Sequence, residues 1–206
     1  MVAYVCDGVY SMGNCSPIRE LRQLQERYEV FLYIDDGHGI SVCGRRGEGF
    51  ARTQFPPLLG ERTIVAASLE NGFGASGGIL MLGTAHQEAL FRRHFIPGAL
   101  KAAISAALGS CRIHRSAELG QRQGRLSQRV DLFDRRIETA GLGNSLPIRV
   151  IVVGSEINAI TIARRLRHGG FNALVTSFPT VEQRKSGIRV CITAEHEAPD
   201  IERLCD

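Results

Sequence analysis

The sequence VFLYIDDGHG, residues 30–39, joins a continuous apolar run to a turn that holds two aspartates and a histidine. Such an apolar run is typical of a strand that is buried on both faces of a parallel sheet. The preceding stretch IRELRQLQERY (18–28) has apolar residues at helical spacing, and VAYVC (2–6) is another short apolar run. Ser16 and Pro17 suit the N-cap and the first residue of that helix. The order strand, helix, strand predicts a right-handed βαβ unit.

Further strands and helices are predicted downstream of this unit. Apolar runs and apolar periodicity predict strands at 63–68 and 77–83 and helices at about 85–94 and 97–140. The longer helix contains Gly109 and Gly120, which favour a break within it.

The segment GLGNSLP (141–147) has the composition of a linker, and the pattern restarts after it. Strands are predicted at 148–153, 172–176 and 188–193, and helices at 156–168 and near 198–205. We therefore predict an α/β fold with a larger portion, 1–140, that has a mainly parallel sheet, and a smaller α+β portion, 146–206.

The overall composition is that of an ordinary soluble globular protein, with 44% hydrophobic and 22% charged residues and a net charge of +4. Charges interrupt every apolar run, so no membrane span is predicted. The start MVAYVCDGVYSM lacks the basic and long apolar parts of a secretory signal. None of the six cysteines forms a CxxC pair, so a metal or redox site is not expected. Reduced thiols and a cytoplasmic location are the expectation.

Basic residues outnumber acidic ones between Ala85 and Ala140. The basic residues there are Arg92, Arg93, Lys101, Arg112, Arg115, Arg122, Arg125, Arg129, Arg135 and Arg136, and the acidic ones are Glu88, Glu118, Asp131, Asp134 and Glu138. One interpretation is an arginine-rich surface that binds anions or nucleic acid. The other is a solvated helix face with charge pairs at i,i+3 and i,i+4. Aromatic residues that could stack on bases are few among these arginines, which favours the second interpretation.

Polar residues follow the first three predicted strands. CDGVYS follows the first strand, Asp35-Asp36-Gly37-His38 the second, and Ser68 and Asn71 the third. Ligands of open α/β sheets bind beyond the carboxyl ends of strands, so these clusters are candidates for one site. A metal site at DDGH is disfavoured, because side chains at adjacent positions cannot all face one ion.

Several motifs occur along the chain in a fixed order. They are DGVYSM, DDGHGISVCGRRGEG, ERTIVAASLENGFGASGGILML, SFPTV and GIRVCITAEHE. This order resembles the α-oxoamine synthases, whose pattern is DGVFSMDG, DDAHGxGVxGxxGxG, a TLSKAFGxxGG-like segment, RPPTVP and RLRxTxTAxHT. These are pyridoxal 5'-phosphate (PLP) enzymes of fold type I. They include 8-amino-7-oxononanoate synthase, glycine C-acetyltransferase, 5-aminolevulinate synthase and serine palmitoyltransferase. The resemblance runs over nearly the whole chain.

The resemblance implies a fold, an activity and partners. The fold would be a partial PLP-binding large domain at 1–140 and a small C-terminal domain at 146–206. The ancestral reaction would be that of a PLP-dependent acyl-CoA:amino acid C-acyltransferase. The chain would form a homodimer, or a heterodimer with an intact family member. The family also has a long N-terminal half without a counterpart here, so the sheet should have an uncovered edge and exposed apolar faces.

The resemblance also implies roles for individual residues. Asp35 matches the aspartate that pairs with the pyridine nitrogen of PLP; a carboxylate keeps that nitrogen protonated, so the ring can accept electrons. His38 matches the histidine near the phenolic oxygen of the cofactor, and Ser11 matches a serine near the same edge. Ser68 matches the residue that binds the phosphate. The alternatives are a strand-end carboxylate, a loop histidine and ordinary turn serines.

Two positions depart from the family where it needs charged side chains. Asn71 stands at the lysine that forms an imine with PLP, and an amide nitrogen is neither a useful nucleophile nor a base near neutral pH. Ser177 stands at an arginine for the amino-acid carboxylate, where a serine cannot offer a charged fork. Arg189 matches the second arginine of that region.

These departures predict a relative that is catalytically inactive as it stands, a pseudoenzyme. It would be a scaffold subunit that completes a dimer with an active partner, or a relic without a present role. The remaining alternatives are an active PLP enzyme and the arginine-rich anion- or nucleic-acid-binding protein.

Overall fold

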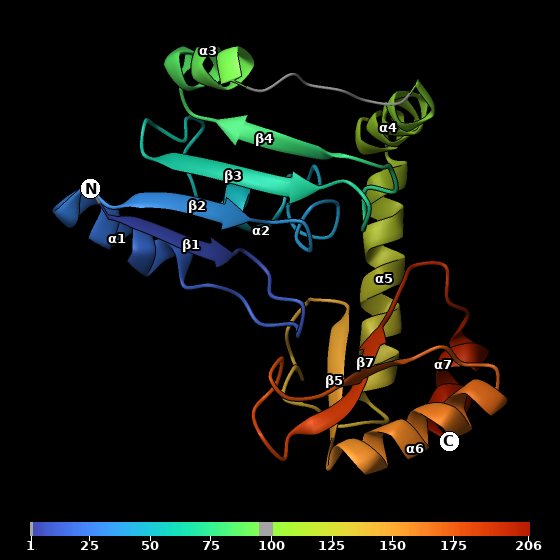
Figure 1. The fold of residues 1–206 in the computed structure, drawn as a ribbon. Helices are drawn as coiled ribbons and strands as arrows, with labels where there is room; N and C mark the ends of the chain where they lie inside the picture. The colour runs from blue at the N-terminus through green and yellow to red at the C-terminus, as the bar shows by residue number, and fades with distance from the viewer. Residues whose placement is uncertain (1, 95–100) are drawn as a thin grey trace. The chain divides into compact units, whose positions relative to one another are not determined.

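The computed structural model describes residues 2–94 and 101–206 (Figure 1). By internal contacts the chain divides into two compact units. The first unit is Met1–Tyr10 with Cys15–Gly120, and the second is Ser11–Asn14 with Gln121–Asp206. A compact unit defined by contacts need not coincide with a domain. The domain boundary expected between residues 140 and 146 therefore stays a prediction.

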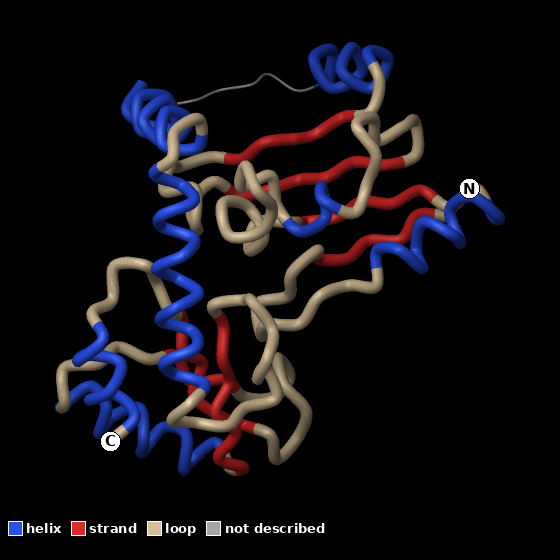
Figure 2. The backbone as a smooth tube through the Cα atoms, turned by 180° about the vertical axis from the view of Figure 1, so that it is seen from behind, coloured by secondary structure: helices blue, strands red, loops and turns tan. Residues whose placement is uncertain are grey.

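The first unit contains a four-stranded sheet in the order β1-β2-β3-β4. The strands are β1 (Ala3–Asp7), β2 (Phe31–Asp35), β3 (Thr63–Ser68) and β4 (Gly78–Leu82). β1, β2 and β3 are parallel, and β4 is antiparallel to β3. Figure 2 shows the four strands side by side with β1 and β4 at the edges. The α1 helix (Ile18–Tyr28) connects β1 to β2, so the predicted order of strand, helix and parallel strand is confirmed.

One face of this sheet carries the hydrophobic core of the unit, and apolar side chains of the edge strands are exposed on the other face. Leu32 and Ile34 of β2 and Val65 of β3 pack with Ile18 and Leu21 of α1. Because successive strand side chains point to opposite faces, the residues between them line the other face.

Apolar residues on that second face of the sheet are exposed. Val5 of β1 is 70% exposed and Leu80 of β4 is 43% exposed. Parallel sheets usually have both faces covered. The exposed apolar face expected from the sequence is therefore present.

The start of α1 differs from the prediction. The helix begins at Ile18, with Pro17 as the N-cap residue and no side-chain cap hydrogen bond. The Ser16 hydroxyl instead donates to the Tyr10 hydroxyl at 3.0 Å. Since Pro17 holds the N-cap position and no side chain caps the helix, the prediction of Ser16 as the N-cap was wrong.

Four more helices follow in the order of the chain: α2 (Phe50–Thr53), α3 (Ala85–His94), α4 (Lys101–His114) and α5 (Glu118–Asp134). The predicted long helix is thus broken, but at residues 115–117 rather than at Gly109 or Gly120, which both lie inside helices. Arg115 and Ser116 end α4 through turn hydrogen bonds to Cys111 and Ile113. The predicted start at 97 lies outside the described residues.

The second unit contains a three-stranded antiparallel sheet in the order β5-β7-β6. Its elements are β5 (Ile148–Gly154), α6 (Glu156–His168), β6 (Leu174–Thr176), β7 (Ser186–Cys191) and α7 (Ala198–Cys205). Ser155 caps α6 by accepting the Asn158 N–H, as short polar N-cap residues do. Figure 1 shows α6 and α7 beside this sheet, and Val130 and Phe133 of α5 pack with Ile188 and Ile201 in the same core.

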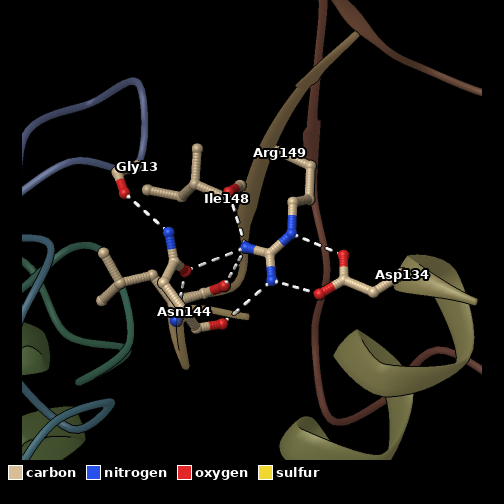
Figure 3. A network of polar contacts seen from close by, with 6 residues as sticks. Gly13, Asp134, Asn144, Ile148 and Arg149 are labelled. Atoms are coloured by element: carbon tan, nitrogen blue, oxygen red, sulfur yellow. Dashed lines mark hydrogen bonds and ion pairs between the residues drawn. The ribbon is translucent and has the colours of Figure 1, made fainter. Parts of the chain in front are cut away.

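A buried arginine anchors this second unit (Figure 3). Arg149 of β5 is fully buried, and its guanidinium binds Asp134 bidentately with distances of 2.7 and 2.8 Å. It also donates to the backbone carbonyls of Leu146 and Ile148 and to the side chain of Asn144. A buried charge needs such a full set of partners, because it has lost its hydration.

No helix among the described residues is long and apolar enough to cross a bilayer.

Candidate functional site

The carboxyl ends of β1, β2 and β3 lie at one edge of the first sheet. The parallel register pairs Asp7 with Asp35, and Asp35 with Ala66. Asp35 is exposed, and its Oδ1 accepts the Gly37 N–H at 2.9 Å. A Cβ placed on Gly37 would lie 3.3 Å from the Ser68 backbone nitrogen, so the end of β3 closely approaches this turn.

Asp7 lies in the CDGVYS cluster and has no role of its own in the family resemblance. Burial raises the pKa of Asp7, the neighbouring negative Asp35 raises it further, and His38 lowers it. Asp7, Asp35 and His38 therefore lie close enough to interact electrostatically. The signal was available in the sequence, because Asp7 directly follows the first predicted strand and parallel neighbours end together.

The turn between β3 and β4 is held by its backbone. The Leu69 N–H donates to the Gly77 carbonyl at 2.9 Å, and the Ala75 N–H donates to the Leu69 carbonyl at 2.8 Å. Gly74 and Gly77 have φ angles of 73° and 108°, a region that side chains with a Cβ rarely adopt. The shape of this turn is therefore set by glycines and main-chain hydrogen bonds, whichever residue stands at position 71.

Asn71 is exposed on this turn and reaches toward the Asp35 turn. Its side-chain Nδ2 donates to the Gly37 carbonyl at 3.1 Å. The backbone carbonyl of Asn71 accepts the Gly74 N–H at 3.1 Å. Ser68 lies at the start of the turn, where its Oγ accepts the Glu70 N–H at 3.2 Å. The first unit thus brings Asp35, Ser68 and Asn71 into one neighbourhood.

Asp36, the second aspartate of the DDGH motif, is completely buried. Its Oδ2 accepts the Ala51 N–H at 2.8 Å, whereas Oδ1 has no partner among the described residues. A Cβ on Gly8, Gly39 or Gly49 would come within 2.5 Å of a carboxylate oxygen of Asp36. The glycines at these positions therefore make the space that this carboxylate fills.

The environment of Asp36 disfavours its charged form. Burial raises the pKa of Asp36 to about 7; the Ala51 N–H counteracts this, and the negative Asp35 adds to it. Cys43 lies close by, where its own burial raises the pKa of its thiol to about 12 and the negative charge of Asp36 raises it further. Asp36 was a candidate from the sequence, but its burial was not foreseen, because nothing in DDGH distinguishes the exposed from the buried aspartate.

The other predicted site residues belong to the second unit. The Nε of Arg189 donates to the Ser11 carbonyl at 2.6 Å. Asn144, held by Arg149, donates to the Gly13 carbonyl at 3.2 Å, so the Ser11–Asn14 segment is tied at two points (Figure 3). Ser177 begins a turn in which its carbonyl accepts the N–H groups of Thr180 and Val181.

Within the described ranges 2–94 and 101–206, no group of three or more His, Cys, Asp or Glu side chains could hold a metal ion.

The chain resembles known proteins in sequence and in fold. The family described as aminotransferase class I and II matches residues 11–206. The 8-amino-7-oxononanoate synthases of Salmonella agona (strain SL483) and Klebsiella pneumoniae (strain 342) are each 32% identical to it over 215 residues. These matches cover 98% of this chain and 54% of each relative.

Two solved structures illustrate the likeness in fold. Serine palmitoyltransferase from S. paucimobilis, solved with a bound PLP–myriocin aldimine, superposes with a TM-score of 0.83 at 20% identity, covering 98% of this chain and 52% of that one. The 8-amino-7-oxononanoate synthase from Francisella tularensis superposes with a TM-score of 0.76 at 19% identity, covering 99% and 61%. The predicted fold, a partial fold type I transferase, is thereby confirmed.

The chain spans about half the length of the curated relatives it matches. The resemblance inferred from the order of the motifs is confirmed, and the chain belongs to the aminotransferase class I and II family.

Proposed function

We propose that the chain derives from a PLP-dependent acyl-CoA:amino acid C-acyltransferase and is catalytically inactive as it stands. One observation carries this proposal: Asn71 occupies the turn in which the reacting lysine is expected, and its amide is engaged with the Gly37 carbonyl at 3.1 Å. The chain has only two lysines, Lys101 and Lys185, and neither belongs to this turn. An amide cannot supply the amine, because its nitrogen lone pair is delocalised into the carbonyl.

The residues at the strand ends fit PLP as a non-covalent ligand. The exposed carboxylate of Asp35 can hold a proton on the pyridine nitrogen of the cofactor. Ser68 accepts the Glu70 N–H through its oxygen, so its hydroxyl hydrogen can still be donated to a phosphate. When bound, PLP supplies an electron sink for a carbanion beside its ring. His38 lowers the pKa of Asp7, and this interaction supports a role for His38 beside the same cluster.

Substrate binding is weakened on the second unit. Ser177 replaces a charged fork with a neutral hydroxyl. Arg189 remains, and the Ser11 carbonyl fixes its Nε at 2.6 Å. One guanidinium without its second partner binds a carboxylate less firmly than a pair does.

A scaffold subunit is the second candidate, and the exposed apolar face of the first sheet favours it. Val5 of β1 and Leu80 of β4 are 70% and 43% exposed, and edge strands with such residues tend to pair with other chains. The proposed partner is a second copy of the chain or an intact family member. Co-expression with 8-amino-7-oxononanoate synthase should raise the yield of soluble chain and give a co-eluting complex. A well-behaved monomer that unfolds cooperatively on its own would count against the scaffold.

Several arginines of the arginine-rich helices pair with groups of the chain itself, which supports the interpretation as a solvated, charge-paired helix face. Arg122 pairs with Glu195 at 2.7 Å, Arg129 donates to the His196 carbonyl at 2.8 Å, and Arg136 pairs with Asp206. Guanidinium groups used in this way are less available to phosphates. Salt-dependent DNA binding with a micromolar or lower Kd would revive the nucleic-acid alternative.

The direct test of inactivity is trapping with borohydride. The chain is mixed with an equimolar amount of PLP, reduced, and digested for mass spectrometry. We expect no PLP adduct between Ser68 and Gly78, whereas surface labelling of Lys101 or Lys185 would be independent of the site. An adduct within that turn, or turnover of glycine and an acyl-CoA by the chain alone, would contradict the proposal.

A further inference from the structure

Ser41 stands in a backbone conformation that favours glycine. Its φ angle is 69°, in the left-handed region, and only 8% of the residue is exposed. The pattern DDAHGxGVxGxxGxG, which this segment resembles, has a glycine at the same position. A serine here is strained, so a contact of its hydroxyl is needed to offset that strain.

The hydroxyl of Ser41 meets an imidazole from the end of α4. The distance from Ser41 Oγ to His114 Nε2 is 2.9 Å, and His114 Nδ1 lies 2.8 Å from the Ser110 carbonyl oxygen. A carbonyl only accepts hydrogen bonds, so Nδ1 carries the proton. In the neutral ring Nε2 is then the acceptor of the Ser41 hydroxyl.

The same imidazole supports the turn that carries Asn71. The ring centroids of Phe73 and His114 are 4.9 Å apart. A Cβ on Gly72 would lie 2.9 Å from the Ile40 carbonyl oxygen and 3.3 Å from the Ser41 Cβ. The turn at 71–74 therefore packs against residues 40–41 and against the end of α4.

We propose that Ser41 and His114 form a lock that holds the 71–74 turn against the 36–41 turn without a cofactor. Asn71 adds a second tie between the same turns through the Gly37 carbonyl. Ser41 and Asn71 both depart from the family pattern. Asn71 adds a polar contact between the two turns, and Ser41 adds one to the α4 imidazole that contacts Phe73. The lock thus keeps the ligand-facing edge of the sheet ordered in a chain that cannot anchor PLP through a lysine.

A serine beside an oriented histidine also resembles a nucleophile with its general base. With 8% of Ser41 exposed, the hydroxyl is placed for a structural contact rather than for attack on a substrate carbonyl. The inference rests on the proposed function only in identifying the 71–74 turn as the former lysine turn. Its test uses no PLP, so a failed lock and a failed assignment of function are distinguishable.

Hydrogen exchange in the cofactor-free chain tests the lock. Four variants are compared with wild type: Ser41→Ala, Ser41→Gly, His114→Phe and the double variant Ser41→Ala/His114→Phe. Ser105→Ala, at an exposed serine of α4, is the matched control. The probes are the hydrogen-bonded amides of Leu69, Gly74 and Ala75 in the turn, with Val65 in the sheet core as the reference for global unfolding.

We expect the turn amides to exchange roughly 2- to 10-fold faster in each single variant, which corresponds to the loss of one hydrogen bond. Exchange at Val65 should change less than at the turn. Ser41→Gly relieves the backbone strain and should still loosen the turn, which separates the hydrogen bond from the strain. The double variant should be no faster than His114→Phe, because every variant removes the Ser41–His114 bond and only the change at His114 also removes the bond to the Ser110 carbonyl.

Three results would overturn the lock. These are turn amides that exchange as in wild type in Ser41→Ala and Ser41→Gly, additive effects in the double variant, and labelling of Ser41 by a fluorophosphonate probe. The last result would identify Ser41 as an accessible nucleophile instead.

Discussion

The Asn71 turn and the Arg149 network represent two ways of fixing a loop. The turn at 68–78 is held by main-chain hydrogen bonds and by glycines at positive φ, and its side chain at position 71 is exposed. The network holds the 141–147 segment through one buried guanidinium and its carboxylate partner. A turn shaped by its backbone can lose its reactive side chain and keep its shape. A loop that depends on a buried charge cannot lose either partner without a large cost.

The largest effect is expected in the Arg149 network. Asp134→Asn leaves the guanidinium buried without its countercharge, and should lower the free energy of unfolding by about 3–5 kcal/mol. Urea unfolding followed by circular dichroism measures this change in the free energy of unfolding. Hydrogen exchange at the amides of β5 and β7 shows whether the loss is local to the second sheet.

Arg136→Ala is the control for that prediction, because Arg136 pairs with Asp206 at the surface. Exposed pairs contribute about 1 kcal/mol or less. Equal losses in the two variants would refute the contrast between buried and exposed pairs.

The second effect is a pH dependence from Asp36. Its pKa is about 7 in the folded chain and near 3.8 when unfolded, so the folded state holds the extra proton between these values. The contribution of Asp36 to stability should therefore be fully present at about pH 4 and below, fall as the pH rises from there, and level off above about pH 7, with a total loss of about 4 kcal/mol at most. The raised pKa of Asp7 acts in the same direction.

Asp36→Asn should flatten that part of the stability profile, because an amide does not ionise in this range. The measurement is urea unfolding from pH 4 to pH 8 for both chains. If the free energy of unfolding changes with pH by the same slope in wild type and Asp36→Asn, the pKa of Asp36 is not raised in the folded chain.

The strands and helices could be predicted from the sequence wherever apolar periodicity was clear. The runs at 63–68 and 198–205 became β3 and α7 with the same bounds. The α2 helix has four residues, which is too short to show the apolar periodicity that predicts a helix. The antiparallel direction of β4 had no sequence signal of its own.

The candidate site was only partly predictable. Clusters after parallel strands predicted that Asp35, Ser68 and Asn71 lie near each other. The Ser41–His114 contact joins residues that are 73 positions apart, and no local pattern points to it. Arg149 likewise sits in a predicted strand where an arginine would ordinarily be expected at the surface.

The third effect concerns glycine in the Asn71 turn. Gly74 has a φ angle of 73°, and nothing lies within 4 Å of the position that a methyl group would take there. Gly74→Ala should therefore cost about 1–2 kcal/mol through backbone strain alone. Gly124, exposed in α5 and equally uncrowded, is the matched control, and Gly124→Ala should stabilise by up to about 1 kcal/mol. The signs of the two changes in urea unfolding decide the prediction: a stabilising Gly74→Ala would mean that the turn does not need its left-handed residue.

The smallest effect on stability is expected from Asn71 itself. Asn71→Ala removes one exposed hydrogen bond to Gly37, which should change the free energy of unfolding by about 0.5–1 kcal/mol. Thermal unfolding of Asn71→Ala and Asp134→Asn under the same conditions compares the stability lost in the two regions. A loss as large as that of Asp134→Asn would mean that the side chain, and not the backbone, shapes the turn.

The most direct measurement is a comparison of wild type with Asn71→Lys in PLP, followed by borohydride reduction and peptide mapping. We predict that only Asn71→Lys gains an adduct within 68–78, because on the proposed function this turn has the shape of the lysine turn without its amine. An adduct in the wild-type turn would contradict the loss of reactivity. An Asn71→Lys chain that folds but remains unlabelled there would contradict the preserved geometry.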